Sequence, residues 1–104
     1  MESVFEVTQS RPRELRLVGE LDLATVAQLR AAFGKLSGEG QVRLDLFELT
    51  FIDSTGLHAL LTYANSMNGT GPLVLDRVPR SIVRLLELVE LATHPAIEIH
   101  VSDE

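Results

Sequence analysis

The stretch "FIDSTGLHALL", residues 51–61, changes character within a few positions. Two large apolar residues run into the small polar cluster 53–56, and an apolar stripe at helical spacing follows. Asp, Ser and Thr are favoured where helices start, so we expect a helix that begins after Asp53 and packs on a sheet, with Phe51 and Ile52 anchoring the loop before it. The stripe consists of Leu57, Leu60, Leu61, Ala64 and Met67.

Alternating apolar residues on both sides of this helix predict β-strands. They occupy 4–7 and 15–18, joined as a hairpin by "SRPR" at 10–13, and then 42–46, 73–75 and 97–101. Spacings of three and four predict two further helices, with the stripes Leu23, Val26, Leu29, Arg30 and Phe33 and, after Pro79, Ile82, Leu85, Leu86 and Val89. We expect Asp22 or Thr25 to cap the first of them, since Thr25 with Gln28 matches a capping box.

The order β-β-α-β-α-β-α-β defines the expected fold class. Strands separated by helices form parallel pairs, whereas the opening hairpin adds an antiparallel pair. We therefore expect a single α/β domain over residues 1–104, in which a mixed four- to five-stranded sheet with an N-terminal hairpin carries about three helices packed on it.

Composition and charge exclude several classes of function. The chain has 104 residues, a net charge of −6 and no cysteine. Such an acidic chain lacks a landing surface for nucleic acid, and without cysteine there is neither a disulfide framework nor a zinc–thiolate site. The histidines His58, His94 and His100 lack metal-ligand spacing, so we expect neither a metal nor a cofactor. No segment resembles a leader or a membrane span, which predicts a cytoplasmic protein without membrane insertion.

Asp53 and Ser54 have two interpretations. An aspartate at an N-cap accepts a hydrogen bond from a free amide, here that of Thr55 or Gly56, worth about 0.5–2 kcal/mol, and capping alone then explains the acid. Ser54, at the first helical position, points outward, where a phosphate would meet the positive end of the helix dipole. Folding would survive that phosphate, but a partner packed on the helix start would meet about −1.5 to −2 of new charge. The residues alone leave both interpretations open.

The same stretch takes part in a family resemblance. "LTFIDSTGLHALL", preceded by "VRLDLFE" and further upstream by "LVGELDLATVAQLR", closely resembles the bacterial anti-sigma factor antagonists, members of the STAS domain family. A G-E-L-D turn, here residues 19–22, precedes the family's first helix, and a D-S-[ST]-G motif, here 53–56, opens the second. The later segment "VPRSIVRLLELVELA" is similar to the family's third helix. The resemblance spans nearly the whole chain and implies one STAS domain over 1–104.

What the resemblance implies is a partner switch. The unphosphorylated protein would bind an anti-sigma factor with serine kinase activity and so release a sigma factor. Phosphorylation, which maps onto Ser54, would weaken that complex, and a metal-dependent serine phosphatase would restore it. The implied partner surface consists of Asp22, Asp53, Ser54, Thr55, Gly56 and His58. Thr55 and His58 are equally well explained as solvated helix positions.

Other functions are less well supported by the residues. An aspartyl-phosphate enzyme or receiver domain would need a lysine and further acids near Asp53, but Lys35 falls at the end of the first helix and no second aspartate follows two residues on, so we expect no enzyme. Ser81 is a second candidate for phosphorylation, without the flanking acid. The cluster Arg77, Arg80 and Arg84 is explained either as a solvated face or as a patch for an acidic partner.

Related domains also serve as scaffolds in stressosomes or as accessory subunits of lipid-transporting ABC ATPases. Phosphorylation need not matter in the latter, and a serine at a helix start does not decide between these functions. Many family members continue into a further C-terminal helix, whereas this sequence stops at "HVSDE". We therefore also expect an uncovered face that favours a homodimer.

Overall fold

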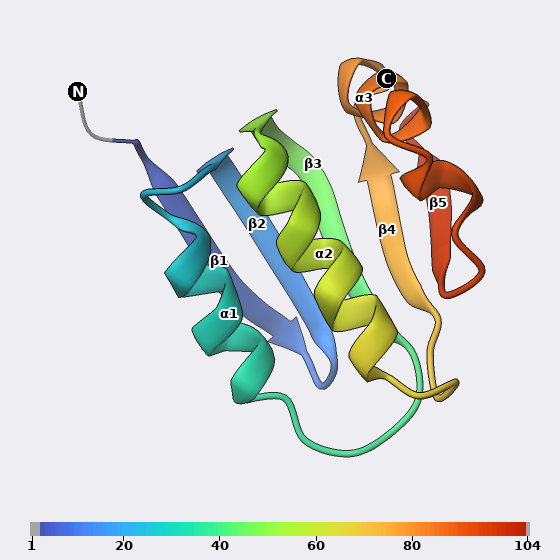
Figure 1. Cartoon of the computed structure of the whole chain (residues 1–104). Helices are drawn as coiled ribbons and strands as arrows, with labels where there is room; N and C mark the ends of the chain where they lie inside the picture. Colours follow the sequence, from blue (N-terminus) through green and yellow to red (C-terminus); the bar gives the residue numbers. More distant parts are fainter. Residues whose placement is uncertain (1–2, 104) are drawn as a thin grey trace.

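A computed structural model describes residues 3–103. Within this range five strands form one sheet in the order β1-β2-β3-β4-β5, connected by three α-helices and a short 3₁₀ helix (Figure 1). The strands are β1 (Phe5–Arg11), β2 (Glu14–Leu21), β3 (Val42–Ile52), β4 (Leu73–Val78) and β5 (Ile97–Val101). The helices are α1 (Val26–Gly34), α2 (Ser54–Ser66), α3 (Arg80–Leu88) and the 3₁₀ helix η1 (Leu91–Thr93).

The sheet is mixed, and the expected order of elements is confirmed. β1 and β2 form an antiparallel hairpin, whereas β2, β3, β4 and β5 pair in parallel. Figure 1 shows α1 and α2 side by side over one face of the sheet, with α3 beyond the end of β4. Because the parallel strands run the same way, β2 and β3 end at the same edge of the sheet, and α2 starts there.

The hydrophobic core lies between the sheet and the helices α1 and α2. Leu17, Leu44 and Leu60 are fully buried in it, one each from β2, β3 and α2. The rings of Phe33 in α1 and Tyr63 in α2 stack with their centroids 3.8 Å apart. Burial of apolar surface stabilises such a core by about 25 cal/mol per Å². This packing fixes the position of α2 relative to the strands beneath it.

Three apolar residues assigned to buried stripes are exposed instead. α1 begins at Val26, so Leu23 lies in the turn before the helix. Val89 is the C-cap residue of α3, and Val101 ends β5. The spacing rule fixes the direction of a side chain only where the backbone is regular, and all three residues lie at or beyond the end of an element.

The capping box expected from Thr25 and Gln28 is not formed, although Thr25 occupies the N-cap position. Its hydroxyl donates to the carbonyl oxygen of Glu20 at 2.8 Å and accepts the N–H of Asp22 at 3.0 Å. The carboxylate of Asp22 accepts the N–H of Ala24 at 2.9 Å. Both side chains therefore hold the turn before α1 rather than the first amides of the helix.

β3 is longer than expected. It runs through residues 47–52, so Phe51 and Ile52 belong to the strand and not to a loop. Ile52 is buried and anchors the end of the strand, whereas the Phe51 side chain is 49% exposed. The expectation was right for Ile52 and wrong for Phe51, because neighbouring residues of a strand point to opposite faces.

The G-E-L-D motif does not form the expected turn over its whole length, because residues 19–21 belong to β2 and only Asp22 lies beyond the strand. Gly19 lies against the backbone of the N-terminal segment. Its φ is +99°, and a Cβ added there would lie 2.2 Å from the carbonyl oxygen of Val4. That oxygen accepts the N–H of Glu20 at 2.8 Å, so it is fixed in place. The glycine is therefore required both by the backbone conformation and by the close approach of the chain.

We expect Gly19→Ala to lower the free energy of unfolding by more than about 2 kcal/mol, because it combines a positive φ with a clash against backbone. Gly69→Ala is the matched control: Gly69 has φ +79° but nothing near its Cβ position. This control substitution should lower the free energy of unfolding, measured in urea, by only about 1 kcal/mol, as expected for backbone strain alone. Equal losses for the two variants would show that the approach to Val4 is unimportant.

Candidate functional site

The G-E-L-D and D-S-T-G motifs meet where β2 and β3 end. Leu21 pairs with Ile52 in the parallel ladder, and the N–H of Asp53 donates to the carbonyl oxygen of Leu21 at 3.1 Å. The two chains then diverge, one into the turn before α1 and the other into α2. Two segments some thirty positions apart in the sequence thus form one continuous surface at this edge of the sheet.

Two irregularities in β3 set the direction of the residues that enter the site. Opposite Arg16 and Val18 of β2 lie Asp45 and Glu48 of β3, so β3 holds one extra residue there. A second extra residue, Thr50, lies between the partners of Gly19 and Glu20, and its hydroxyl donates to the Gly19 carbonyl at 3.1 Å. Such bulges re-aim the side chains that follow them.

Asp53 joins the two motifs through its side chain. Its Oδ1 atom accepts the N–H of Gly56 at 3.0 Å and so caps α2, which confirms the capping interpretation. Its Oδ2 atom accepts the N–H of Leu23 at 3.3 Å, in the turn before α1. One carboxylate therefore holds two backbone segments together.

Gly56 explains the last position of the motif. It is buried, and a Cβ there would lie 2.8 Å from Cγ1 of Ile52 and 2.9 Å from Cγ of Leu21. The absence of a side chain lets the first turn of α2 pack directly on the ends of β2 and β3. Among the residues of the implied partner surface, Gly56 thus acts by packing and presents no side chain to a partner.

Ser54, Thr55 and His58 lie on the first turns of α2. Ser54 and His58 are exposed, and Thr55 is half-buried. Ser54 follows the cap directly, and its hydroxyl forms no hydrogen bond with any other residue of the range 3–103. An exposed hydroxyl without an internal partner is accessible to a modifying enzyme, and its loss would cost the fold little.

Asp22 lies on the same surface, in the turn that Asp53 holds. The hydrogen bond from the Ser3 hydroxyl is the main reason that the pKa of Asp22 is lowered, with further bonds from Ala24 and Thr25 outweighing desolvation. Asp22 and Asp53 form no ion pair with any cation of the described chain. The surface is therefore acidic, and no ion pair within residues 3–103 neutralises these two carboxylates.

Two residues of this surface were missed from the sequence. Leu23 is 77% exposed and Phe51 49% exposed, and together with Asp22, Ala24 and Asp53 they line a shallow hollow of about 390 Å³. The spacing rule placed Leu23 in a buried stripe, although the alternative cap at Thr25 already implied a helix that begins after Leu23. Phe51 was open to prediction, because a buried Ile52 requires its neighbour in a strand to point outward.

The family model described as "Mlab, STAS domain" matches residues 5–99. The chain belongs to the STAS domain family. Its fold is similar to that of a solved structure described as "Structure of the Anti-Sigma Factor Antagonist SpoIIAA in its Unphosphorylated Form", with a TM-score of 0.68 and 18% sequence identity. The similarity covers 94% of this chain and 89% of that one, so it extends over nearly the whole fold. The family expected from the two motifs is thus confirmed.

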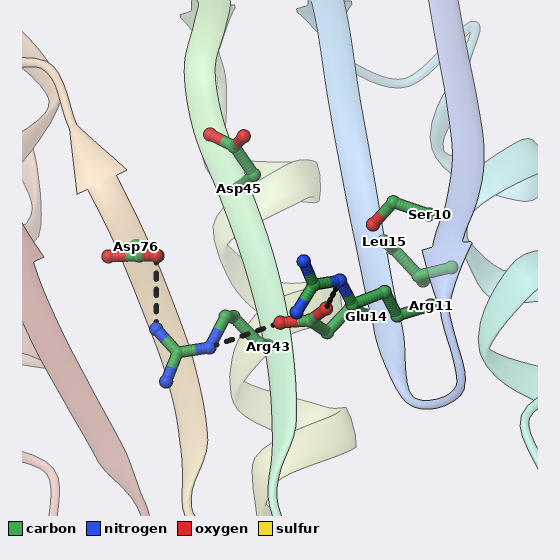
Figure 2. A pocket seen from close by; sticks show the side chains of 7 residues that line it. All are labelled: Ser10, Arg11, Glu14, Leu15, Arg43, Asp45 and Asp76. Atoms are coloured by element: carbon green, nitrogen blue, oxygen red, sulfur yellow. Dashed lines mark ion pairs between the residues drawn. The ribbon is translucent and has the colours of Figure 1, made fainter.

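This STAS domain has a second hollow, of about 490 Å³, which lies over β1, β2, β3 and β4 and is lined mainly by charged side chains (Figure 2). In it Arg43 bridges Glu14 at 3.4 Å and Asp76 at 3.0 Å, and Arg11 contacts Glu14 at 3.6 Å. Opposite charges on neighbouring strands stabilise a sheet modestly, by about 0.2–1 kcal/mol a pair. Because these acids already have cationic partners, we assign this hollow a structural role.

Asp45 lines the same hollow and is also structural. Its carboxylate accepts hydrogen bonds from Arg77 at 2.7 Å and from the N–H of Phe47 at 3.1 Å, and the Arg77 guanidinium lies 4.6 Å from the centre of the Phe47 ring. Burial by itself raises the pKa of Asp45. The two hydrogen bonds and the nearby charges of Arg77 and Arg16 outweigh that effect, so the pKa is lowered overall. This acid stabilises the first irregularity of β3.

The remaining polar candidates lie elsewhere on the STAS domain. Ser81 is exposed in the first turn of α3. Arg80 and Arg84 form no ion pair within residues 3–103, which agrees with their interpretation as part of a solvated face. His94 and His100 contact Asn65 and Glu98, and no group of three or more described His, Asp and Glu side chains is arranged to hold a metal ion. No helix in this range is long and apolar enough to cross a membrane.

We expect Asp53→Ala to lower the free energy of unfolding of the STAS domain by about 1–2 kcal/mol, because it removes both the cap of α2 and the bond to Leu23. Asp53→Asn is the matched variant. It keeps one acceptor oxygen, so it should retain the cap and lie between wild type and Asp53→Ala in urea unfolding. In amide exchange, Leu23 should lose protection in the alanine variant. An alanine variant as stable as wild type would contradict the role of Asp53 as a link.

Proposed function

We propose that this STAS domain, residues 1–104, is an anti-sigma factor antagonist. In its unphosphorylated form it binds an anti-sigma factor with serine kinase activity and so releases a sigma factor. The kinase phosphorylates Ser54 and thereby ends the complex, and a metal-dependent serine phosphatase restores the free hydroxyl. In this proposal the chain is the substrate of these enzymes and not an enzyme itself, and it acts in the cytoplasm, where the kinase finds ATP.

The observation that carries the proposal is the position of Ser54. Its exposed hydroxyl directly follows the Asp53 cap, on a surface where Asp22 and Asp53 have no cationic partner within residues 3–103. Membership of the STAS family and the fold similarity to the SpoIIAA structure support the same function. Thr55 and His58, next to Ser54 on α2, are proposed as further contacts of the partner.

A phosphate on Ser54 would act on binding rather than on folding. The start of α2 has free amides and the positive end of a helix dipole, so the folded domain tolerates an anion there. A partner packed on the same surface must instead accommodate about −1.5 to −2 of additional charge next to Asp53. Burial of that charge without a counter-ion would weaken the complex.

The required energy is within reach of one modification. Driving a complex from about 99% to about 1% formed takes roughly 5.5 kcal/mol. Leaving an interfacial charge buried and unpaired costs about 2–5 kcal/mol or more. Competition between the sigma factor and this chain for the same anti-sigma factor would contribute the remainder.

An accessory subunit that is never phosphorylated remains the alternative, either on a lipid-transporting ABC ATPase or in a stressosome. It deserves a test because the matching family model, "Mlab, STAS domain", does not name an anti-sigma factor antagonist. On this alternative the same surface binds its partner permanently. In that case Ser54 is never phosphorylated, so the charge that Ser54→Asp introduces would imitate no natural state of the protein.

We expect Ser54→Ala to bind the purified anti-sigma factor kinase of the native organism with the affinity of wild type, because an exposed hydroxyl without internal bonds contributes little. Ser54→Asp should bind at least tenfold more weakly in isothermal titration calorimetry, because it places charge beside Asp53.

Ser81→Asp is the matched control, since it adds the same charge to the first turn of another helix, α3. It should leave the affinity within about twofold of wild type, a difference below 0.5 kcal/mol. Equal affinities of Ser54→Ala and Ser54→Asp would contradict the proposed switch. Binding to an ABC ATPase instead of the kinase would favour the accessory subunit.

A further inference from the structure

The hollow beside the start of α2 combines exposed apolar side chains with two acids that form no ion pair in the described part of the chain. Leu23 is 77% exposed and Phe51 49% exposed, and Asp22 and Asp53 complete the lining together with Ala24. Scattered exposed apolar residues are ordinary, but two large ones that line the same hollow are not. A packed partner would remove both from water.

Both apolar residues are held in place by the fold. The N–H of Leu23 donates to Asp53, and the turn around it is fixed by the buried Thr25, whose hydroxyl bonds to Glu20 and Asp22. Phe51 lies in β3, where it pairs with Glu20 of β2. Because neither backbone segment must become ordered on binding, such a surface loses little entropy when a partner docks.

The charge of the hollow specifies the chemistry of the partner. Asp22 and Asp53 use some of their acceptor sites on backbone amides and on Ser3, but a carboxylate has about four such sites, and no cation of residues 3–103 pairs with either acid. An arginine or lysine of a partner would complement Asp22 across the interface. Ser54 is not among the residues that line the hollow, although it directly follows Asp53, which is.

We propose that this hollow receives an apolar side chain of the partner protein, seated between Leu23 and Phe51 and followed by a basic side chain that pairs with Asp22. This proposal rests on the proposed function, in which the partner is the anti-sigma factor kinase. Leu23 and Phe51 are then the main contributors to affinity, since residues that become desolvated in a well-packed pocket near the centre of an interface dominate binding energy. Asp22 contributes to orientation and to the rate of association.

The test compares Leu23→Ser, Phe51→Ser and Asp22→Asn with wild type by isothermal titration calorimetry against the purified kinase. Each serine variant should weaken binding at least tenfold. Asp22→Asn should weaken it less and reduce its dependence on salt, because one ion pair is lost. The matched control is Leu88→Ser on α3, since Leu88 is 80% exposed but lies outside the hollow. It should leave the affinity unchanged.

The outcomes separate this proposal from the one on which it rests. If wild type binds, Ser54→Asp does not, and both serine variants bind like wild type, the hollow is not the docking site and the switch stands. If wild type does not bind the kinase, both proposals fall. Loss of binding in Leu88→Ser as well as in Leu23→Ser would contradict a site confined to the hollow.

Two further measurements test whether the variants remain folded and whether a second copy of this chain occupies the hollow. Leu23 is so exposed that Leu23→Ser should keep the melting temperature of wild type, and an unfolded variant would contradict the exposure on which the proposal depends. Light scattering of wild type and Leu23→Ser reports the oligomeric state. A wild-type dimer that the substitution converts to a monomer would show that a second copy of this chain occupies the hollow, and would overturn the proposed occupant.

Discussion

The double role of Asp53 is the constraint on which the rest of the site depends. One oxygen caps α2 at Gly56 and the other holds the Leu23 amide in the turn before α1. A helix cap is worth about 1 kcal/mol, which is modest, but here the same group also fixes the relative position of two segments. The surface that carries Ser54 is therefore pre-organised by backbone contacts, so a modification of Ser54 can change binding without having to reshape the fold.

The four residues of the D-S-T-G motif have different roles because they face different parts of the structure. Asp53 faces the backbone, and Gly56 faces the ends of β2 and β3, where a Cβ would clash with Leu21 and Ile52. Ser54 faces solvent, and Thr55 lies half-buried between them. The residues that build the site are thus distinct from the one that we propose is modified. This separation lets Ser54 vary in charge while the cap and the packing of α2 are kept.

Much of the fold followed from the sequence, because long regular segments determine side-chain direction. The order of elements, the hairpin and the start of α2 after Asp53 were all predicted. What failed lay where regularity ends: Leu23 precedes α1, and Phe51 follows two extra residues in β3. The link from Asp53 to Leu23 could not be predicted either, because it joins residues thirty positions apart whose contact depends on strand register. The acids and Ser54 were found by motif, whereas the meeting of Leu23 and Phe51 in one hollow required the structure.

The most direct test of the central claim is peptide mass mapping of the protein isolated from its native cells, beside a Ser54→Ala variant. The account predicts a single phosphoryl group on Ser54 that is absent from the variant. No phosphate under any growth condition, or phosphate only at Ser81 or another residue, would contradict the switch. Asp53 and Ser54 would then be the start of a helix in a constitutive binding subunit.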